Sequence, residues 1–139
     1  MTNSLKLKFE DYSLFHLNAK NRLTHYLGIP LIALSLIGLL SKISFQSINL
    51  GQILCLFAFI FYFKLDKKIA VLFSIILILF YAIGLYLTIP QIILFQMSGW
   101  VLQFIGHLVY EKKSPAFLKN LEHVLIGPLW IFAKLIRYN

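Results

Sequence analysis

The chain has 139 residues, of which 60% are hydrophobic and 13% charged, and its mean hydropathy is +0.82. A soluble domain carries about 25% charged residues, so this composition excludes an ordinary globular surface and indicates an integral membrane protein. The formal net charge of +8 does not predict a nucleic-acid partner, because the Lys and Arg residues lie mostly between and beside apolar runs, as topology signals do. The apolar runs are continuous and do not alternate, which favours helices over a barrel.

Four apolar runs predict membrane-spanning helices. We expect the spans at about residues 24–41, 43–63, 69–89 and 92–110. A span needs about 20 apolar residues, so the first run is marginal and the third is secure. Residues 116–138 alternate apolar and polar positions at helical spacing, which predicts an amphipathic or re-entrant helix interrupted near Gly127 and Pro128. The expected fold is all-α: an integral membrane four-helix bundle with N-terminal and C-terminal amphipathic helical segments, in a single membrane domain covering residues 1–139.

The basic residues also predict an orientation. With four spans, the N-terminus, the second loop and the C-terminus share one side and hold most of the Lys and Arg residues, whereas the opposite side holds only Lys42. Positive charge concentrates on the cytoplasmic side of membrane proteins. We therefore expect both termini to be cytoplasmic, in a bacterial inner membrane or the endoplasmic reticulum.

Polar residues in the fourth run need an explanation. Gln103, His107 and Glu111 are four residues apart and form one stripe along a helix, which Trp100 joins. The stripe should face the protein interior, because polar groups that face lipid are costly.

The other histidines are predicted to lie near the same face of the membrane as His107. His16 and His25 precede or begin the first span, and His123 follows the fourth, so the predicted topology brings all four histidines to the cytoplasmic face. Asn21 lies four residues before His25, and Asn18 can cap a helix that starts there. A bend at Asn18 would let His16 fold back toward His25, although the spacing does not force it.

Several neutral imidazoles near a carboxylate suit a first-row transition metal, with iron, zinc and copper all open. Gln103 and Asn21 could then orient the ligands. The same residues could instead serve a proton relay or an interhelical hydrogen-bond network that only holds the helices together. Tyr12 and Trp130 are interpreted as interfacial anchors.

Three segments carry a family resemblance: FHLNAKNRLTHYLGIP (15–30), GWVLQFIGHLVYEKKSPAFLKNL (99–121) and GPLWIFAK (127–134). Their order and spacing resemble the small membrane family that includes the fungal 2-hydroxy fatty acid dioxygenase of phytosphingosine breakdown. Residues 31–95 match only as hydrophobic spans. Two departures stand out, since the family's Asn-Pro is Asn18-Ala19 here and Lys134 stands where the family often has an acidic residue.

The resemblance implies an Fe(II)-dependent dioxygenase that uses O₂ and cleaves a 2-hydroxy fatty acid to the fatty acid one carbon shorter. Its partners would be that acid or a related lipid and the membrane lipids. By their match to the family positions, four residues are predicted to be catalytic: His16, His25, His107 and Glu111. The three histidines would be the iron ligands, with Glu111 and His123 as candidate additional ligands. Asn21 and Gln103 are predicted to support the iron ligands. Arg22 and Trp100 are predicted to bind the substrate.

Two other functions stay open from the sequence. One is a non-enzymatic small membrane transporter or lipid-binding scaffold, in which the His, Gln and Glu residues form a structural network. The other is a zinc hydrolase acting on lipids, although the HExxH spacing of such enzymes is missing.

Overall fold

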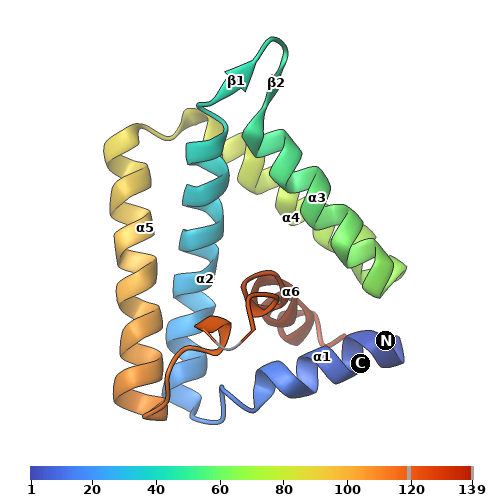
Figure 1. The fold of residues 1–139 in the computed structure, drawn as a ribbon, viewed down its shortest axis with the longest axis vertical. Coiled ribbons are helices and arrows are strands. Elements are labelled where there is room, and N and C mark those ends of the chain that lie inside the picture. The colour runs from blue at the N-terminus through green and yellow to red at the C-terminus, as the bar shows by residue number, and fades with distance from the viewer. Residues whose placement is uncertain (119, 139) are drawn as a thin grey trace. The chain divides into compact units, whose positions relative to one another are not determined.

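A computed structural model describes residues 1–118 and 120–138 (Figure 1). The described chain is helical apart from one short hairpin, in the order α1 (Asn3–Ser13), α2 (Ala19–Leu40), β1 (Ser44–Phe45), β2 (Ile48–Asn49), α3 (Leu50–Leu65), α4 (Lys67–Tyr86), α5 (Ile89–Phe104), a π-helix (Ile105–Glu111), a 3₁₀ turn (Ala116–Leu118) and α6 (His123–Leu135). It divides into two compact units. Unit 1 comprises Met1–Pro30 and the described residues from Ser98 onward, and unit 2 comprises Leu31–Met97.

Three helices are long and apolar enough to cross a membrane, which agrees with the prediction of an integral membrane protein. They are α2 with 22 residues, α4 with 20, and α5 together with the π-helix, Ile89–Glu111, with 23. A four-helix bundle is not confirmed, because the second predicted span forms a helix of only 16 residues. Large apolar side chains along α4 are exposed, among them Val71, Ile75 and Ile78, as expected for side chains that face lipid.

The predicted span 43–63 is wrong at its start. Residues 44–49 form an antiparallel hairpin in which Ser44 pairs with Asn49 and Phe45 with Ile48. Gln46 turns the hairpin in the left-handed region, at φ 54°. Asn49 then caps α3, because its side chain accepts from the backbone N–H of Gln52 while the Gln52 side chain accepts from the Asn49 N–H. This reciprocal cap fixes the start of α3 at Leu50.

Replacing Asn49 with alanine is expected to lower the free energy of unfolding by about 1 kcal/mol, because a helix N-cap is lost. Asn49 also donates to the Tyr81 hydroxyl at 2.8 Å, and that bond would be lost as well. Thermal unfolding in detergent would measure the effect. Asn49→Asp keeps a capping oxygen and should retain most of the stability, so an equal loss in both variants would contradict the capping argument.

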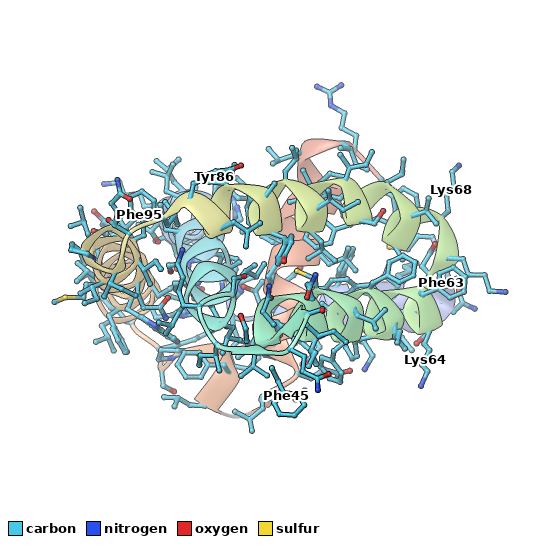
Figure 2. The ribbon with its side chains drawn as sticks, turned by 90° about the horizontal axis from the view of Figure 1, so that it is seen from above. Phe45, Phe63, Lys64, Lys68, Tyr86 and Phe95 are labelled. Carbon is cyan, nitrogen blue, oxygen red and sulfur yellow. The ribbon has the colours of Figure 1, made fainter. Side chains whose placement is uncertain are left out.

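In unit 2, α3 and α4 pack against each other and are joined by Asp66 alone. Asp66 caps the start of α4 by accepting from the N–H groups of Lys68 and Ile69. The predicted charged turn between the second and third spans is therefore present and tight. Figure 2 shows Lys64 and Lys68 extending outward at the same end of this helix pair, where they can reach lipid headgroups.

In unit 1, α1 packs against α6 (Figure 1). The buried face of α1 consists of Leu5, Phe9 and Tyr12, and Trp130 of α6 donates from Nε1 to the Ser13 hydroxyl at 3.0 Å. The amphipathic helix predicted at 116–138 is wrong in its extent, and residue 119 lies outside the described residues.

The α6 helix starts only at His123 and continues through Pro128 without the expected interruption. Two local features explain this. Asn120 accepts from the Glu122 N–H and so forms a turn before the helix starts. Pro128 lies in the second turn of α6, where it removes one backbone hydrogen bond; helices of membrane proteins accommodate such prolines when neighbouring groups satisfy the freed backbone carbonyl.

Candidate metal centre

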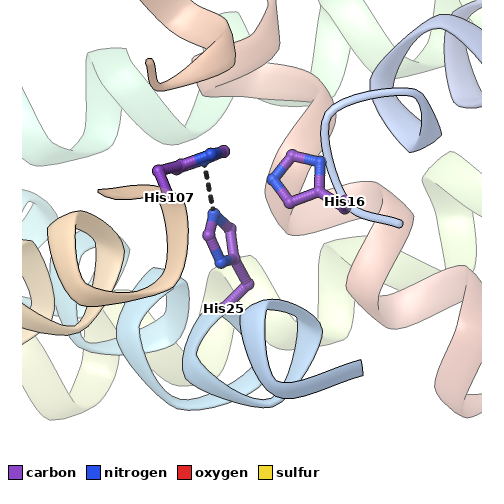
Figure 3. A group of neighbouring side chains, drawn as sticks. All are labelled: His16, His25 and His107. Carbon is purple, nitrogen blue, oxygen red and sulfur yellow. Dashed lines mark hydrogen bonds between the residues drawn. The ribbon is translucent and has the colours of Figure 1, made fainter. Parts of the chain in front are cut away.

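Three histidines from distant parts of the sequence meet inside unit 1 (Figure 3). His16 lies in the connection between α1 and α2, His25 in α2 and His107 in the π-helix. Their ring centroids are 4.4 Å (His16–His25), 5.0 Å (His16–His107) and 4.7 Å (His25–His107) apart. Each ring offers one nitrogen within 4.8 Å of the others, and each residue is at most 2% exposed. We call these residues the histidine triad.

The chain reverses before α2, and the reversal brings His16 back to His25. Asn18 caps the helix by accepting from the Lys20 N–H at 2.8 Å. The Arg22 guanidinium donates from Nη1 to the carbonyl oxygens of His16 at 3.2 Å and Leu17 at 2.6 Å. The sequence did not decide whether His16 and His25 converge; in the structure they do, and these local bonds hold the loop in the reversed conformation.

Backbone carbonyl oxygens fix the tautomer of two imidazoles of the triad, so that their lone pairs lie on Nε2. His16 donates from Nδ1 to the Tyr12 carbonyl at 2.7 Å, and His25 donates from Nδ1 to the Asn21 carbonyl at 2.8 Å. A carbonyl oxygen only accepts, so Nδ1 carries the proton and Nε2 carries the lone pair in both rings. Histidines that bind metals are commonly oriented in this way by a carbonyl at the other nitrogen.

His107 comes from a π-helix, in which the wider turn changes the direction of the side chains that follow. Such segments are rare and occur frequently at functional sites. The segment ends at Lys112, which adopts the left-handed conformation at φ 55°. The His107 Nε2 atom lies 3.0 Å from His25 Nε2. Because His25 Nε2 carries a lone pair, His107 is the donor in this contact.

The residues at this centre fit a bound metal. His16 Nε2 and His107 Nδ1 are buried without a hydrogen-bond partner among the described residues. An unpaired buried polar atom costs about 1–3 kcal/mol, so the loss at His16 Nε2 would be recovered by a cation bound there. The three rings each offer a nitrogen within 4.8 Å of the others, and imidazole nitrogens are ligands that suit iron, zinc and copper.

Burial also keeps His16 in the form that binds metals. Removal from water lowers the pKa of its imidazole to about 4, although the hydrogen bond to the Tyr12 carbonyl acts in the opposite direction. His16 is therefore neutral at pH 7, with the Nε2 lone pair available.

Glu111 lies beside the triad rather than within it. Its Oε1 accepts from the Leu17 N–H at 3.0 Å, and its Oε2 accepts from the Asn18 N–H and from Asn21 Nδ2, both at 2.9 Å. The group of side chains close enough to hold a metal contains the three histidines and not this carboxylate.

The other predicted site residues have separate surroundings. His123 is buried and lies 2.8 Å from Asp11, through Nε2 and Oδ2, outside the triad. Gln103 is buried, with its Nε2 unpartnered among the described residues and close to Gly28 of α2. Trp100 packs edge-on against Phe117. The contact of Arg22 and Trp100 with a substrate stays a prediction.

The sequence analysis did not predict that aromatic side chains pack against His16. Tyr12 stacks on His16 with ring centroids 4.1 Å apart, and Trp130 lies 5.9 Å from the same ring. Tyr12 is 3% exposed and Trp130 is 2% exposed, so neither is the interfacial anchor that was expected. The four-residue spacing between Tyr12 and His16 was the available signal for this contact.

These features define a small helical membrane protein with a buried three-histidine centre, and comparison with known proteins assigns its family. A family model described as "2-hydroxy-palmitic acid dioxygenase Mpo1-like" matches residues 2–138, and the chain belongs to this Mpo1-like family. It is 32% identical over 133 residues to the 2-hydroxy-palmitic acid dioxygenase MPO1 of Saccharomyces cerevisiae. This alignment covers 91% of the chain and 76% of the yeast protein. No solved structure matches the chain.

Proposed function

We propose that this protein is an Fe(II)-dependent dioxygenase that cleaves 2-hydroxy fatty acids to the fatty acid one carbon shorter, with His16, His25 and His107 as the iron ligands. The observation that carries the proposal is the convergence of three buried imidazoles, with carbonyl bonds orienting two of them. The relative named a 2-hydroxy-palmitic acid dioxygenase supports the substrate class.

Iron bound at the triad would supply a chelation site for the 2-hydroxy acid and the means to activate O₂. The overall reaction R–CH(OH)–COOH + O₂ → R–COOH + CO₂ + H₂O balances in atoms and electrons, so O₂ suffices as the oxidant.

The protein's own residues hold and shield the reacting groups. The carbonyls of Tyr12 and Asn21 keep the protons of His16 and His25 on Nδ1, away from the ligand side. The rings of Tyr12 and Trp130 cover His16 and exclude water from that side. These contacts prepare the donor set before substrate arrives, which lowers the cost of reorganisation.

The membrane context fits an acyl substrate. The triad lies near the start of α2 and the end of the long helix Ile89–Glu111, so a polar head could bind there while the acyl tail lies along apolar helices. The excess of Lys and Arg near both termini supports a cytoplasmic location for this end.

The experiment is elemental analysis of protein purified anaerobically in detergent, followed by turnover of 2-hydroxyhexadecanoic acid with O₂. We expect iron close to one per chain, conversion to pentadecanoic acid, and loss of activity on chelation that Fe(II) restores. Full activity of thoroughly chelated, metal-free protein would overturn the proposal. Metal-free protein without turnover would favour a structural network, and stoichiometric zinc would indicate another enzyme class.

A further inference from the structure

A pair of side chains, Asn21 and Glu111, links the three segments that carry the histidine triad. Asn21 is fully buried and belongs to α2, one turn before His25. Glu111 ends the π-helix, four residues after His107. The bond from Asn21 Nδ2 to Glu111 Oε2, at 2.9 Å, joins these two segments directly.

Asn21 uses both of its side-chain amide hydrogens in this link. One Nδ2 hydrogen goes to Glu111, and the other goes to the carbonyl of Phe15, the residue before His16, at 3.1 Å. Its backbone carbonyl accepts from His25 Nδ1. Because both amide hydrogens have oxygen partners, the orientation of the amide is determined. One residue therefore touches the His16 loop, the His25 ring and the helix of His107.

Glu111 joins the π-helix to the loop that carries His16. Its two oxygens accept three hydrogen bonds, from the N–H groups of Leu17 and Asn18 and from Asn21. Hydrogen bonds to an ionised carboxylate are stronger than neutral ones. The neighbouring Tyr110 carbonyl also accepts from Asn18 Nδ2 at 3.0 Å. Three hydrogen bonds thus join the loop that follows His16 to the helix of His107, and the bond from Asn21 adds a fourth from α2.

We propose that Asn21 and Glu111 form a clamp that sets the metal affinity of the triad by positioning His16 and His107 against His25, and that Glu111 acts through these hydrogen bonds and not as a metal ligand. The inference rests on the metal centre of the proposed function. Loss of a partner that orients metal ligands typically lowers affinity about 10–100-fold, so an effect of that size is expected here.

The first test is Glu111→Gln in the full chain, with Co(II) as the probe and titration of metal-free protein in detergent followed by visible absorption. The substitution keeps the shape but removes the charge and replaces one acceptor by a donor facing N–H groups. We expect about 10–100-fold weaker Co(II) binding, with the ligand-field band of the saturated protein in its original position. A shifted band at saturation would indicate that Glu111 is a ligand and would overturn the clamp.

Glu122→Gln is the matched control. Glu122 also belongs to unit 1, and its carboxylate pairs with Lys8 at 2.7 Å and belongs to neither the triad nor the clamp. The same chemical change should leave Co(II) affinity within about twofold of the original protein, well below the loss expected of an orienting partner. Equal affinity in the original protein and Glu111→Gln would overturn the clamp while leaving the metal centre intact. Failure of the original protein to bind Co(II) or Fe(II) would instead overturn the proposed metal centre.

A second variant pair tests the link itself. Asn21→Asp places a carboxylate against Glu111, which should weaken Co(II) binding at least as strongly as Glu111→Gln. Combining Asn21→Asp with Glu111→Gln restores a donor–acceptor pair in the reverse sense, so the double variant should bind Co(II) more tightly than Asn21→Asp alone. Residues in one hydrogen-bond network are non-additive. Strictly additive losses, with unfolding temperatures unchanged, would contradict the clamp.

Discussion

Replacing His107 with alanine is expected to abolish iron binding and turnover together. The variant removes one of three imidazoles and leaves His25 Nε2 without the ring that now lies 3.0 Å away. Losing a ligand should cost more than losing an orienting partner, so we expect Fe(II) affinity to fall by more than about 100-fold. Elemental analysis after anaerobic reconstitution, together with turnover of 2-hydroxyhexadecanoic acid, measures both effects.

His123→Ala is the matched control for that experiment. His123 is also buried and also lies in unit 1, but its Nε2 contacts Asp11 and it lies outside the triad. This variant should lose some stability, because a partly buried hydrogen bond is removed, and should retain its iron. Loss of iron in His123→Ala to the extent seen in His107→Ala would show that the triad is not the metal site.

The long apolar helices could be predicted because apolar runs and charged breaks are local signals. The predicted spans 24–41, 69–89 and 92–110 correspond to α2, α4 and the long helix Ile89–Glu111 within a few residues. The hairpin before α3 was missed because Ile43, Phe45 and Ile48 extend the apolar run toward the N-terminus. The spacing of Asn49 and Gln52, which suits a capping box, was the local signal for the true start of α3.

Only the depth of the candidate site in the membrane could be predicted from the sequence, and not the contacts between its residues. Topology placed His16, His25 and His107 near one face, and the structure brings their rings together. The clamp could not be predicted, because it joins Glu111 to backbone N–H groups at Leu17 and Asn18, more than 90 residues away in the chain. Backbone donors carry no residue type, so no sequence pattern marks them. The iron itself stays a prediction.

Gly106→Ala is expected to damage the centre without changing any of its polar groups. A Cβ atom at Gly106 would overlap Asn21 Oδ1 and Thr24 Oγ1 and would lie 3.2 Å from His25 Cε1. Neither oxygen can easily give way, since Thr24 donates to the Asn21 carbonyl at 2.7 Å and the clamp holds the Asn21 amide. The His25 ring or its helix must therefore shift. Overpacking of this kind costs about 1–3 kcal/mol, and we expect Co(II) affinity to fall at least tenfold, the lower end for a disturbed orienting contact.

The control for Gly106→Ala is another tightly packed glycine, Gly84 of unit 2. A Cβ atom at Gly84 would lie 2.9 Å from the Cα of Gly38, where α4 meets α2. Small residues at such crossings allow close packing of membrane helices, so Gly84→Ala should lower the unfolding temperature in detergent to a similar degree. Unit 2 contains none of the three histidines, so Co(II) affinity should be unchanged. Parallel losses of metal affinity in the two variants would mean that Gly106→Ala acts through general instability. A loss confined to Gly106→Ala would assign the effect to the packing of Gly106 against Asn21, Thr24 and His25.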